Sequence, residues 1–367
     1  MNADINLGYM GSLPVTIDTE NTLNGSIAIV GASGCGKSVE LQRIACENVL
    51  NGQTVLVISQ HGTMAEDQIF EYYKEVFDKY RTDVYATDEG VPCSLFRPIR
   101  YCDGKSESVE EMVGALADVL SRALKLGKRQ KSVLNTALMN VYDENLYQCE
   151  GLSSLELVLK QMDTKNSLDL LELLKPILRK NIFKDGELVN EGRLNIVHLE
   201  RMDLTTQEIV MEILLSYIWR LANADQFKRQ PICVFLDESQ NIASGAKSPL
   251  ALMLSEGRKM GVNIVLATQL ISNNTQNAVQ QRPTQVGLML FFKPALSQIN
   301  STARLISSKD DGTWTRRLRT LKVGEFVAVG NFRVAGKTID YPLVVSANVD
   351  KIHTLSEESK YKKADER

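Results

Sequence analysis

The chain has 367 residues, 44% of them hydrophobic and 24% charged, which is the composition of one large globular domain or of a domain with an insertion. Its formal net charge is -3, from 42 Lys and Arg against 45 Asp and Glu, and this excludes a protein that coats nucleic acid by its overall charge. The six cysteines form no C-x-x-C pair, which indicates reduced thiols and argues against a disulfide framework or a zinc site.

Seven short apolar runs occur along the chain, and each is typical of a buried strand. They lie at 27–31, 54–59, 194–199, 232–236, 263–267, 287–292 and 326–330. The runs are continuous instead of alternating, which indicates a mostly parallel sheet with helices on both faces. One helix is expected from Thr205, because Thr205 and Glu208 form the T-x-x-E pattern of a capping box.

The segment 104–182 interrupts this order. It is rich in Leu, Glu, Lys and Ser, and its periodicity is helical. We therefore expect an α/β fold with an all-helical insertion, divided into a first part of the core (1–103), the insertion (104–182), a second part of the core (183–354) and a charged, mobile tail (355–367). We find no secretory signal at the start and no apolar run that could cross a bilayer, so we expect a cytoplasmic protein without membrane insertion.

Residues 31–38, "GASGCGKS", follow the first apolar run and precede a helical stretch. They match G-x-x-x-x-G-K-[ST], the P-loop, in the context that makes this motif specific. Its glycines let backbone N–H groups converge on phosphates, while Lys37 reaches the β- and γ-phosphates of ATP and Ser38 ligates magnesium. The motif predicts a P-loop NTPase fold (RecA/FtsK-like) with these nucleotide-binding residues: Gly31, Ser33, Gly34, Cys35, Gly36, Lys37, Ser38 and Val39.

An acidic pair follows the apolar run 232–236. Asp237 can hold the magnesium ion through water, and Glu238 can orient or deprotonate the water that attacks the γ-phosphate. Such a pair can also be an ordinary turn. Combined with the P-loop, however, it indicates ATP hydrolysis coupled to work.

Residues 255–270, "SEGRKMGVNIVLATQL", form a third candidate element. A helix that carries Arg258 turns at Gly261 into a strand that ends at Thr268 and Gln269. Gln269 is placed to sense the γ-phosphate and to take part in catalysis. Arg258 is either a surface cation of its own helix or a catalytic finger that reaches the nucleotide of a neighbouring subunit, where it would stabilise the transition state.

Taken together, five stretches resemble the HerA/FtsK superfamily of ring-forming motor ATPases. They are "LPVTIDTENTLNGSIAIVGASGCGKS", "TVLVISQHGTM", "CVFLDESQN", "EGRKMGVNIVLATQ" and "LKVGEFVAVG". The resemblance implies a homohexameric ring that binds ATP and magnesium at subunit interfaces and double-stranded DNA in its pore. It also implies that Arg258 acts in trans and assigns the nucleotide site to Lys37, Ser38, Asp237, Glu238 and Gln269.

Two features depart from the superfamily pattern. HerA enzymes usually carry a small β-barrel domain before the P-loop, and here only 30 residues precede Gly31. In addition, the Asp-Pro of an Asp-Pro-His-Gly element is replaced by Ser59-Gln60, with His61 and Gly62 kept. The first departure puts the HerA mode of docking a nuclease in doubt, and the second means that any role of that aspartate is lost or moved.

The leading hypothesis is an ATP-driven hexameric translocase of double-stranded DNA, with a helicase-like activity and a separately encoded nuclease or other effector, in DNA processing or antiviral defence. One alternative is an ATPase of the conjugation or type IV secretion kind. Another is a ring scaffold that nucleotide stabilises and that assembles an effector. Stimulation of ATP hydrolysis by duplex DNA distinguishes the first from the last.

Overall fold

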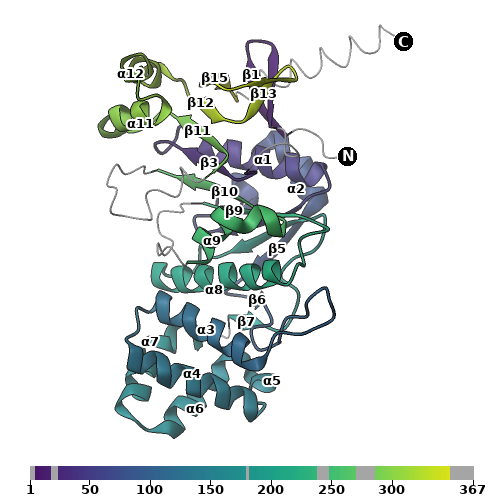
Figure 1. Cartoon of the computed structure of the whole chain (residues 1–367), viewed down its shortest axis with the longest axis vertical. Coiled ribbons are helices and arrows are strands. Elements are labelled where there is room, and N and C mark those ends of the chain that lie inside the picture. Colours follow the sequence, from purple (N-terminus) through teal and green to yellow (C-terminus); the bar gives the residue numbers. More distant parts are fainter. Residues whose placement is uncertain (1–4, 18–23, 179–181, 238–247, 270–285, 348–367) are drawn as a thin grey trace.

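The computed structural model describes residues 5–17, 24–178, 182–237, 248–269 and 286–347. Glu238 and the tail 355–367 therefore lie outside the described residues. Figure 1 shows an elongated molecule with helices at one end, a sheet through the middle, and β-hairpins and two helices at the other end.

Thirteen described strands form one continuous sheet. Seven of them are parallel, in this order across the sheet: β11 (Leu288–Phe292), β3 (Ile27–Val30), β10 (Val262–Thr268), β9 (Ile232–Leu236), β4 (Thr54–Ser59), β8 (Leu194–His198) and β5 (Arg81–Tyr85). The other six continue from β11 as antiparallel neighbours: β12 (Glu325–Gly330), β15 (Leu343–Ser346), β1 (Ile5–Met10), β2 (Leu13–Ile17), β13 (Phe332–Val334) and β14 (Lys337–Ile339).

The prediction of a mostly parallel sheet with helices on both faces is confirmed. All seven apolar runs form strands, and six of them lie in the parallel part, whereas the run at 326–330 forms the antiparallel strand β12. The antiparallel extension as a whole was not predicted from the sequence.

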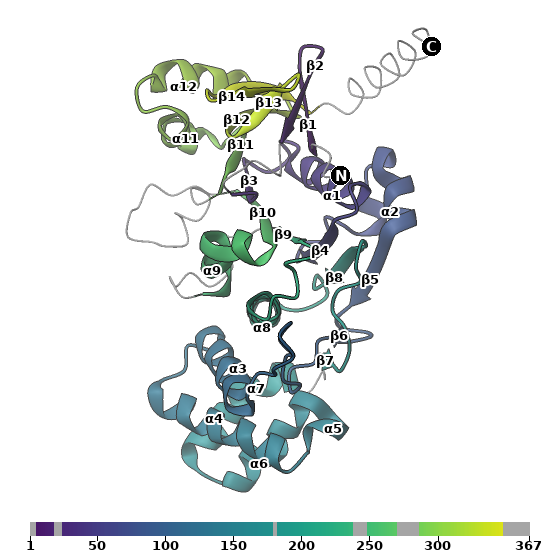
Figure 2. The same ribbon diagram turned by 45° about the vertical axis from the view of Figure 1, so that its right-hand side comes forward.

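Alternate residues of each parallel strand face different layers of helices. Ile27 and Ile29 of β3 pack with residues of α1 (Lys37–Leu50), on the face that α2 (Lys74–Tyr80) also covers. Ala28 and Val30 pack instead with α11 (Ile299–Ile306) and α12 (Asp311–Thr320). Further along the sheet, that second face is covered by α8 (Leu204–Asn223) and α9 (Pro249–Glu256), as Figure 2 shows.

The capping box predicted at Thr205 and Glu208 is wrong. Helix α8 begins at Leu204, and the carboxylate of Asp203 accepts a hydrogen bond of 3.0 Å from the N–H of Thr206. Asp203 is therefore the N-cap, because its side chain satisfies an amide that has no partner within the helix.

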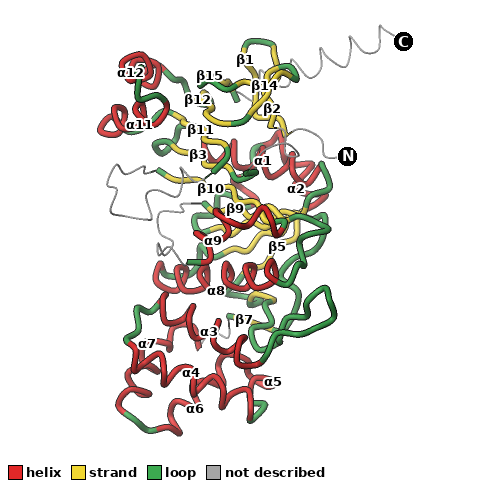
Figure 3. The backbone as a smooth tube through the Cα atoms, viewed as in Figure 1, coloured by secondary structure: helices red, strands yellow, loops and turns green. Residues whose placement is uncertain are grey.

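The described part of the helical insertion contains five α-helices: α3 (Val109–Ala123), α4 (Lys128–Asp143), α5 (Tyr147–Glu150), α6 (Ser154–Met162) and α7 (Lys165–Leu178). Figure 3 shows these helices gathered below α8. A two-stranded parallel sheet of β6 (Val91–Pro92) and β7 (Phe183–Lys184) joins the segments that lead into and out of them. Arg220 of α8 forms a nearly buried pair of hydrogen bonds with Glu107, at 2.5 and 3.0 Å, just before α3 begins. This pair and the shared apolar core hold the insertion on α8.

Short 3-10 helices complete the described structure. They are η1 (Glu66–Gln68), η2 (Glu71–Tyr73), η3 (Gly151–Ser153), η5 (Gly257–Met260) and η7 (Leu296–Gln298).

Candidate nucleotide site

Two positions of the loop between β3 and α1 require glycine, one because of its backbone conformation and one because of its close neighbours. Gly36 has a φ of 108°, and a Cβ atom there would lie 3.2 Å from the amide nitrogen of Gly324. At Gly31 a Cβ atom would lie 2.7 Å from Cβ of Phe292 and 2.8 Å from Sγ of Cys35. The loop is therefore tightly enclosed by β11 and by the turn before β12, and its glycines are required for packing as well as for phosphate access.

The interior of the loop contains a cation and unpaired amides. The ammonium group of Lys37 donates hydrogen bonds of 2.9 Å to the carbonyl oxygens of Gly31 and Ala32, and the residue is 8% exposed. Within the described chain, the backbone amides of Gly36 and Ser38 have no hydrogen-bond partner. Amides at a helix N-terminus beside a lysine make a site for an anion such as a phosphate group.

The eight predicted nucleotide-binding residues all lie in this loop or in the first turn of α1. Burial raises the pKa of the Cys35 thiol above its ordinary value, although nearby Lys37 partly opposes the shift. The thiol also donates a hydrogen bond of 2.8 Å to the carbonyl oxygen of Ala32. Cys35 is therefore a protonated packing residue of the loop, with no sign of a reactive thiolate.

The turn before β12 links the loop to the end of the described chain. The amide of Gly324 donates to the carbonyl oxygen of Cys35 at 3.1 Å, and the amide of Ala347 donates to the carbonyl oxygen of Gly324 at 2.7 Å. The guanidinium of Arg43, in α1, donates to the carbonyl oxygen of Ala347 at 2.7 Å. Arg43 also lies 3.3 Å from Glu40, whose pKa burial raises to about 7. These buried contacts fix α1, the loop and the antiparallel strands relative to one another.

Asp237 and Gln269 follow strands that lie next to the loop. Strand β10 lies directly beside β3, and the amide of Gly31 donates to the carbonyl oxygen of Thr268 at 3.2 Å. Gln269 is the next residue after Thr268, so it lies beside the beginning of the loop. Asp237 follows β9, the neighbour of β10, and is 4% exposed. The strand order thus brings the loop, Gln269 and Asp237 to one edge, the carboxyl ends of parallel strands, where α/β proteins bind ligands.

Arg258 lies at the opposite edge of the sheet. It belongs to η5, just before Gly261, and its side chain is exposed. From there β10 runs through seven residues to reach Gln269, a length of about 20 Å at the usual rise per residue. One chain therefore does not bring Arg258 to its own nucleotide loop.

The residues present fit a nucleotide with magnesium. The loop offers amides and an ammonium group for phosphates, Ser38 is exposed at the start of α1, and a buried carboxylate follows β9. Ser38 and Asp237 are the residues that could hold magnesium, which would neutralise phosphate charge. Among the described residues, no group of three or more His, Cys, Asp or Glu side chains forms a separate metal site.

A buried histidine cluster on the same edge of the sheet was not predicted. Nδ1 of His198 lies 2.9 Å from Oε1 of Glu200, and Nε2 lies 2.7 Å from Oδ1 of Asp83. The ring stacks on Tyr85 with its centroid 4.4 Å away. Burial lowers the pKa of His198, but the hydrogen bonds to the two carboxylates outweigh burial and raise it to about 8. The sequence shows no signal for this cluster, because Asp83 and Tyr85 lie in β5 and are far in the chain from His198 and Glu200.

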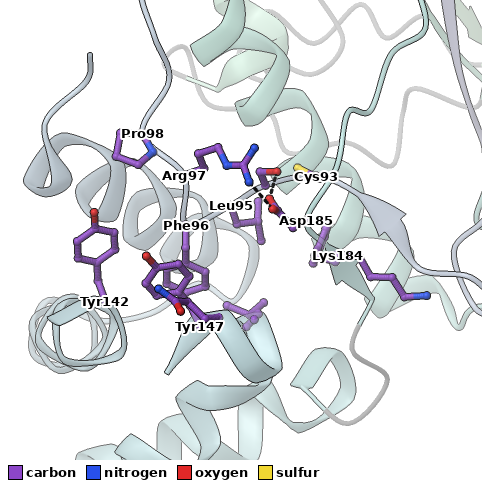
Figure 4. Close-up of a pocket in the computed structure, with 14 residues that line it drawn as sticks. Cys93, Leu95, Phe96, Arg97, Pro98, Tyr142, Tyr147, Lys184 and Asp185 are labelled. Atoms are coloured by element: carbon purple, nitrogen blue, oxygen red, sulfur yellow. Dashed lines mark hydrogen bonds and ion pairs between the residues drawn. The ribbon is translucent and has the colours of Figure 1, made fainter. Parts of the chain in front are cut away.

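Two adjoining cavities lie away from the nucleotide loop. The first lies between the core and the helical insertion, and the described residues that line the second all lie outside the insertion. The volumes of the two cavities are about 400 and 630 Å³, and both are lined by Ser94, Arg97 and Pro98. Figure 4 shows the first, with Arg97 pointing towards Asp185 and aromatic side chains nearby. None of the predicted site residues that the structure describes lines either cavity, so neither of them is the nucleotide site.

The strand, the glycine-rich loop, the lysine and the helix that follows them define a P-loop ATPase. The chain belongs to the family described as the central domain of the helicase HerA, whose model matches residues 5–218. The match includes the loop and ends before Asp237, Arg258 and Gln269. A search of curated proteins finds no match for this chain.

Solved structures with the same fold come from HerA/FtsK-type P-loop ATPases. VirB4 of Thermoanaerobacter pseudethanolicus is 16% identical, with a TM-score of 0.70 over 95% of this chain and 97% of that one. The plasmid coupling protein TrwB in complex with ADP and Mg²⁺ is 14% identical, with a TM-score of 0.57 over 88% of this chain and 85% of that one. At these identities the similarity establishes the fold. No helix among the described residues is long and apolar enough to cross a membrane.

Proposed function

We propose that this ATPase is a homohexameric ring motor that moves double-stranded DNA. The observation that carries the proposal is the division of the candidate residues between the two edges of the sheet. The P-loop, Asp237 and Gln269 lie at the carboxyl edge, and Arg258 lies about 20 Å away at the other edge. A site of this kind is completed when Arg258 of one subunit meets the nucleotide of the next.

In the proposed site, each residue has one role in ATP hydrolysis. Lys37 binds the β- and γ-phosphates, Ser38 and Asp237 hold magnesium, Glu238 orients the attacking water, and Gln269 senses the γ-phosphate. Both the family and the solved complex of TrwB with ADP and Mg²⁺ support ATP and magnesium as the cofactors.

A strongly basic surface supports an anionic partner such as DNA. Residues 304–322 contain six Lys or Arg and two Asp, a net charge of +4 in a chain whose total is -3. Three exposed arginines of α12, which we name the α12 arginine cluster, form no ion pair with any described carboxylate: Arg316, Arg317 and Arg319. A few such cations on each subunit of a ring are enough to hold a DNA backbone.

The remaining parts of the proposal concern organisation and partners. We propose that the core is formed by 1–103 and 183–354, that the insertion 104–182 and the tail 355–367 are available to partners, and that the ring acts in the cytoplasm. A separately encoded nuclease or other effector would process the DNA, in DNA processing or antiviral defence.

A second candidate is an ATPase of conjugation or type IV secretion. The observation in its favour is the similarity to VirB4, which extends over 97% of that chain, together with the similarity to the coupling protein TrwB. Both candidates require the same nucleotide site, so they differ in what the ring moves and where it docks.

The deciding experiment measures ATP hydrolysis with and without duplex DNA, and the mass of the assembly in solution. We expect a hexamer whose hydrolysis rises at least severalfold with duplex DNA, and loss of all hydrolysis in Lys37→Ala. A ring that hydrolyses ATP without responding to DNA would favour the secretion candidate. A ring that needs nucleotide to assemble but does not turn it over would make the protein a scaffold.

A further inference from the structure

A row of polar residues crosses the carboxyl edge of the sheet beside Asp237. The parallel ladders pair Ile58 of β4 with Leu236 of β9, and Ser59 of β4 with His198 of β8. Ser59 and Asp237 are therefore the next residues of adjacent strands, about 4.8 Å apart in the direction of the backbone hydrogen bonds. The order across the edge is Asp237, Ser59, His198.

The alternation of side chains places this row on the face covered by α1. Val57 and Phe235, two residues before Ser59 and Asp237, both pack in the core cluster that contains the apolar side of α1. Ile58 and Leu236 pack in the cluster on the opposite face. Ser59 thus points to the layer in which α1 presents Ser38 at its first turn.

The chain after Ser59 stays close to that part of α1. Gln42 lies four residues after Ser38, on the same side of the helix. Its amide donates hydrogen bonds to the carbonyl oxygens of Thr63 and Gln68, at 2.9 and 3.0 Å, and its oxygen accepts one of 3.0 Å from the N–H of Phe70. These contacts dock the loop that follows β4 against the second turn of α1.

The hydroxyl of Ser59 has no hydrogen-bond partner among the described residues, although Ser59 is completely buried. Its neighbour His198 does not offer one, because both ring nitrogens already face the carboxylates of Glu200 and Asp83. On the other side lies Asp237. A buried hydroxyl without a partner is costly, so it points to a partner supplied when the site is filled.

We infer that Ser59 is a positioning residue of the magnesium site, with its hydroxyl bonded to a water of the ion's hydration shell. Magnesium keeps several of its waters when it binds between phosphates and one or two protein ligands. Ser59 lies one strand away from Asp237, so its hydroxyl and that carboxylate can both contact the same hydration shell. This inference rests on the proposed nucleotide site, and it adds a residue to which no role had been assigned.

The test compares nucleotide affinity with and without magnesium in Ser59→Ala and Ser59→Cys. The readout is the dissociation constant of a fluorescent ADP, measured in magnesium and again in EDTA. Cysteine has the same shape as serine and is somewhat larger, but its thiol is a poor hydrogen-bonding group. We expect both variants to bind ADP as tightly as the wild type in EDTA. In magnesium we expect them to bind it about threefold to tenfold more weakly than the wild type, which is the effect of losing one hydrogen bond.

Ser121→Ala is the matched control. Ser121 in α3 is also buried, and its hydroxyl also has no partner among the described residues, but it lies in the helical insertion. We expect this variant to bind nucleotide like the wild type in both conditions. The inference is overturned if magnesium raises the nucleotide affinity of Ser59→Ala, or of Ser59→Cys, as much as it raises that of the wild type. The packing of Ser59 alone would then explain why serine is present. If the wild type itself binds no nucleotide, the proposed function fails first.

Discussion

His198 gives the protein a pH-dependent stability that can be measured directly. In the folded chain its pKa is about 8, compared with an ordinary value of 6.5, because hydrogen bonds to Asp83 and Glu200 outweigh the effect of burial. A difference of about 1.5 pKa units corresponds to about 2 kcal/mol. Its side chain is 2% exposed, so solvent screening at the ring is small.

The sign follows from the raised pKa. The folded state binds the proton more tightly than the unfolded state, so the contribution is complete below pH 6.5 and is lost as the pH rises through 8. In His198→Gln this contribution is absent. We therefore expect the difference in free energy of unfolding between wild type and variant to shrink by about 2 kcal/mol between pH 6 and pH 9.

The assay is urea unfolding of both proteins at pH 6, 7, 8 and 9, with the free energy extrapolated to water. His61→Gln is measured in parallel as the control, since it makes the same substitution at an exposed histidine. A difference for His198→Gln that is the same at pH 6 and pH 9, or that grows with pH, would refute the assignment of a charged histidine between two carboxylates.

Five further outcomes are expected from variants of the nucleotide site and of α12. Lys37→Ala abolishes binding of fluorescent ATP, whereas Glu238→Gln keeps binding and loses turnover; near-normal hydrolysis in the second would remove Glu238 from its proposed role. Mixing Arg258→Ala subunits with Glu238→Gln subunits restores part of the hydrolysis that each lacks alone, and no recovery would argue against action in trans. Gly36→Ala weakens nucleotide binding at least tenfold, because the new Cβ would lie 3.2 Å from the backbone at a φ of 108°. Replacing the α12 arginine cluster with glutamine lowers DNA stimulation and leaves hydrolysis without DNA unchanged; equal stimulation would exclude this surface.

Six of the seven parallel strands were predictable because they are largely buried on both faces and are therefore continuous apolar runs. The exception is β5, whose residues are all partly exposed and which no predicted run covers. Of the antiparallel extension, only β12 showed the same signal, as the run 326–330. β13 and β14 have three residues each, and β14 is mostly exposed, so neither shows a pattern that differs from a loop.

The start of α8 shows a different limit of sequence analysis. The stretch "MDLTTQE" offers both Asp203 and Thr205 as caps, and the T-x-x-E pattern favours the second. In the structure the carboxylate of Asp203 bonds the N–H of Thr206 and also its hydroxyl, at 2.7 Å. Because Asp203 makes two hydrogen bonds to Thr206, the helix begins one residue earlier than the pattern predicts. A pattern of residue types does not show which of two possible caps makes more hydrogen bonds.

The nucleotide loop was predictable for a related reason: all its parts are contiguous in sequence. The neighbours of Asp237 were not, because they depend on strand order. Ser59 and His198 are far apart in the chain, and the ladders of β9, β4 and β8 bring them into one row. Ser59 stands where the Asp-Pro-His-Gly element of the superfamily has its aspartate. The role of such a substitution can be inferred only when the register of the strands is known.

The two edges of the sheet also constrain how a ring of these subunits would work. Strand β10 begins just after the Arg258 turn and ends just before Gln269. Its first five residues pair with β9 and its last four with β3. A strand held on both sides moves as a rigid body with its sheet. If Arg258 completes the site of the next subunit, any shift of β10 caused by the γ-phosphate at Gln269 is carried to that neighbouring site. The chain would then couple hydrolysis around the ring through one seven-residue strand, with no need for a separate moving element.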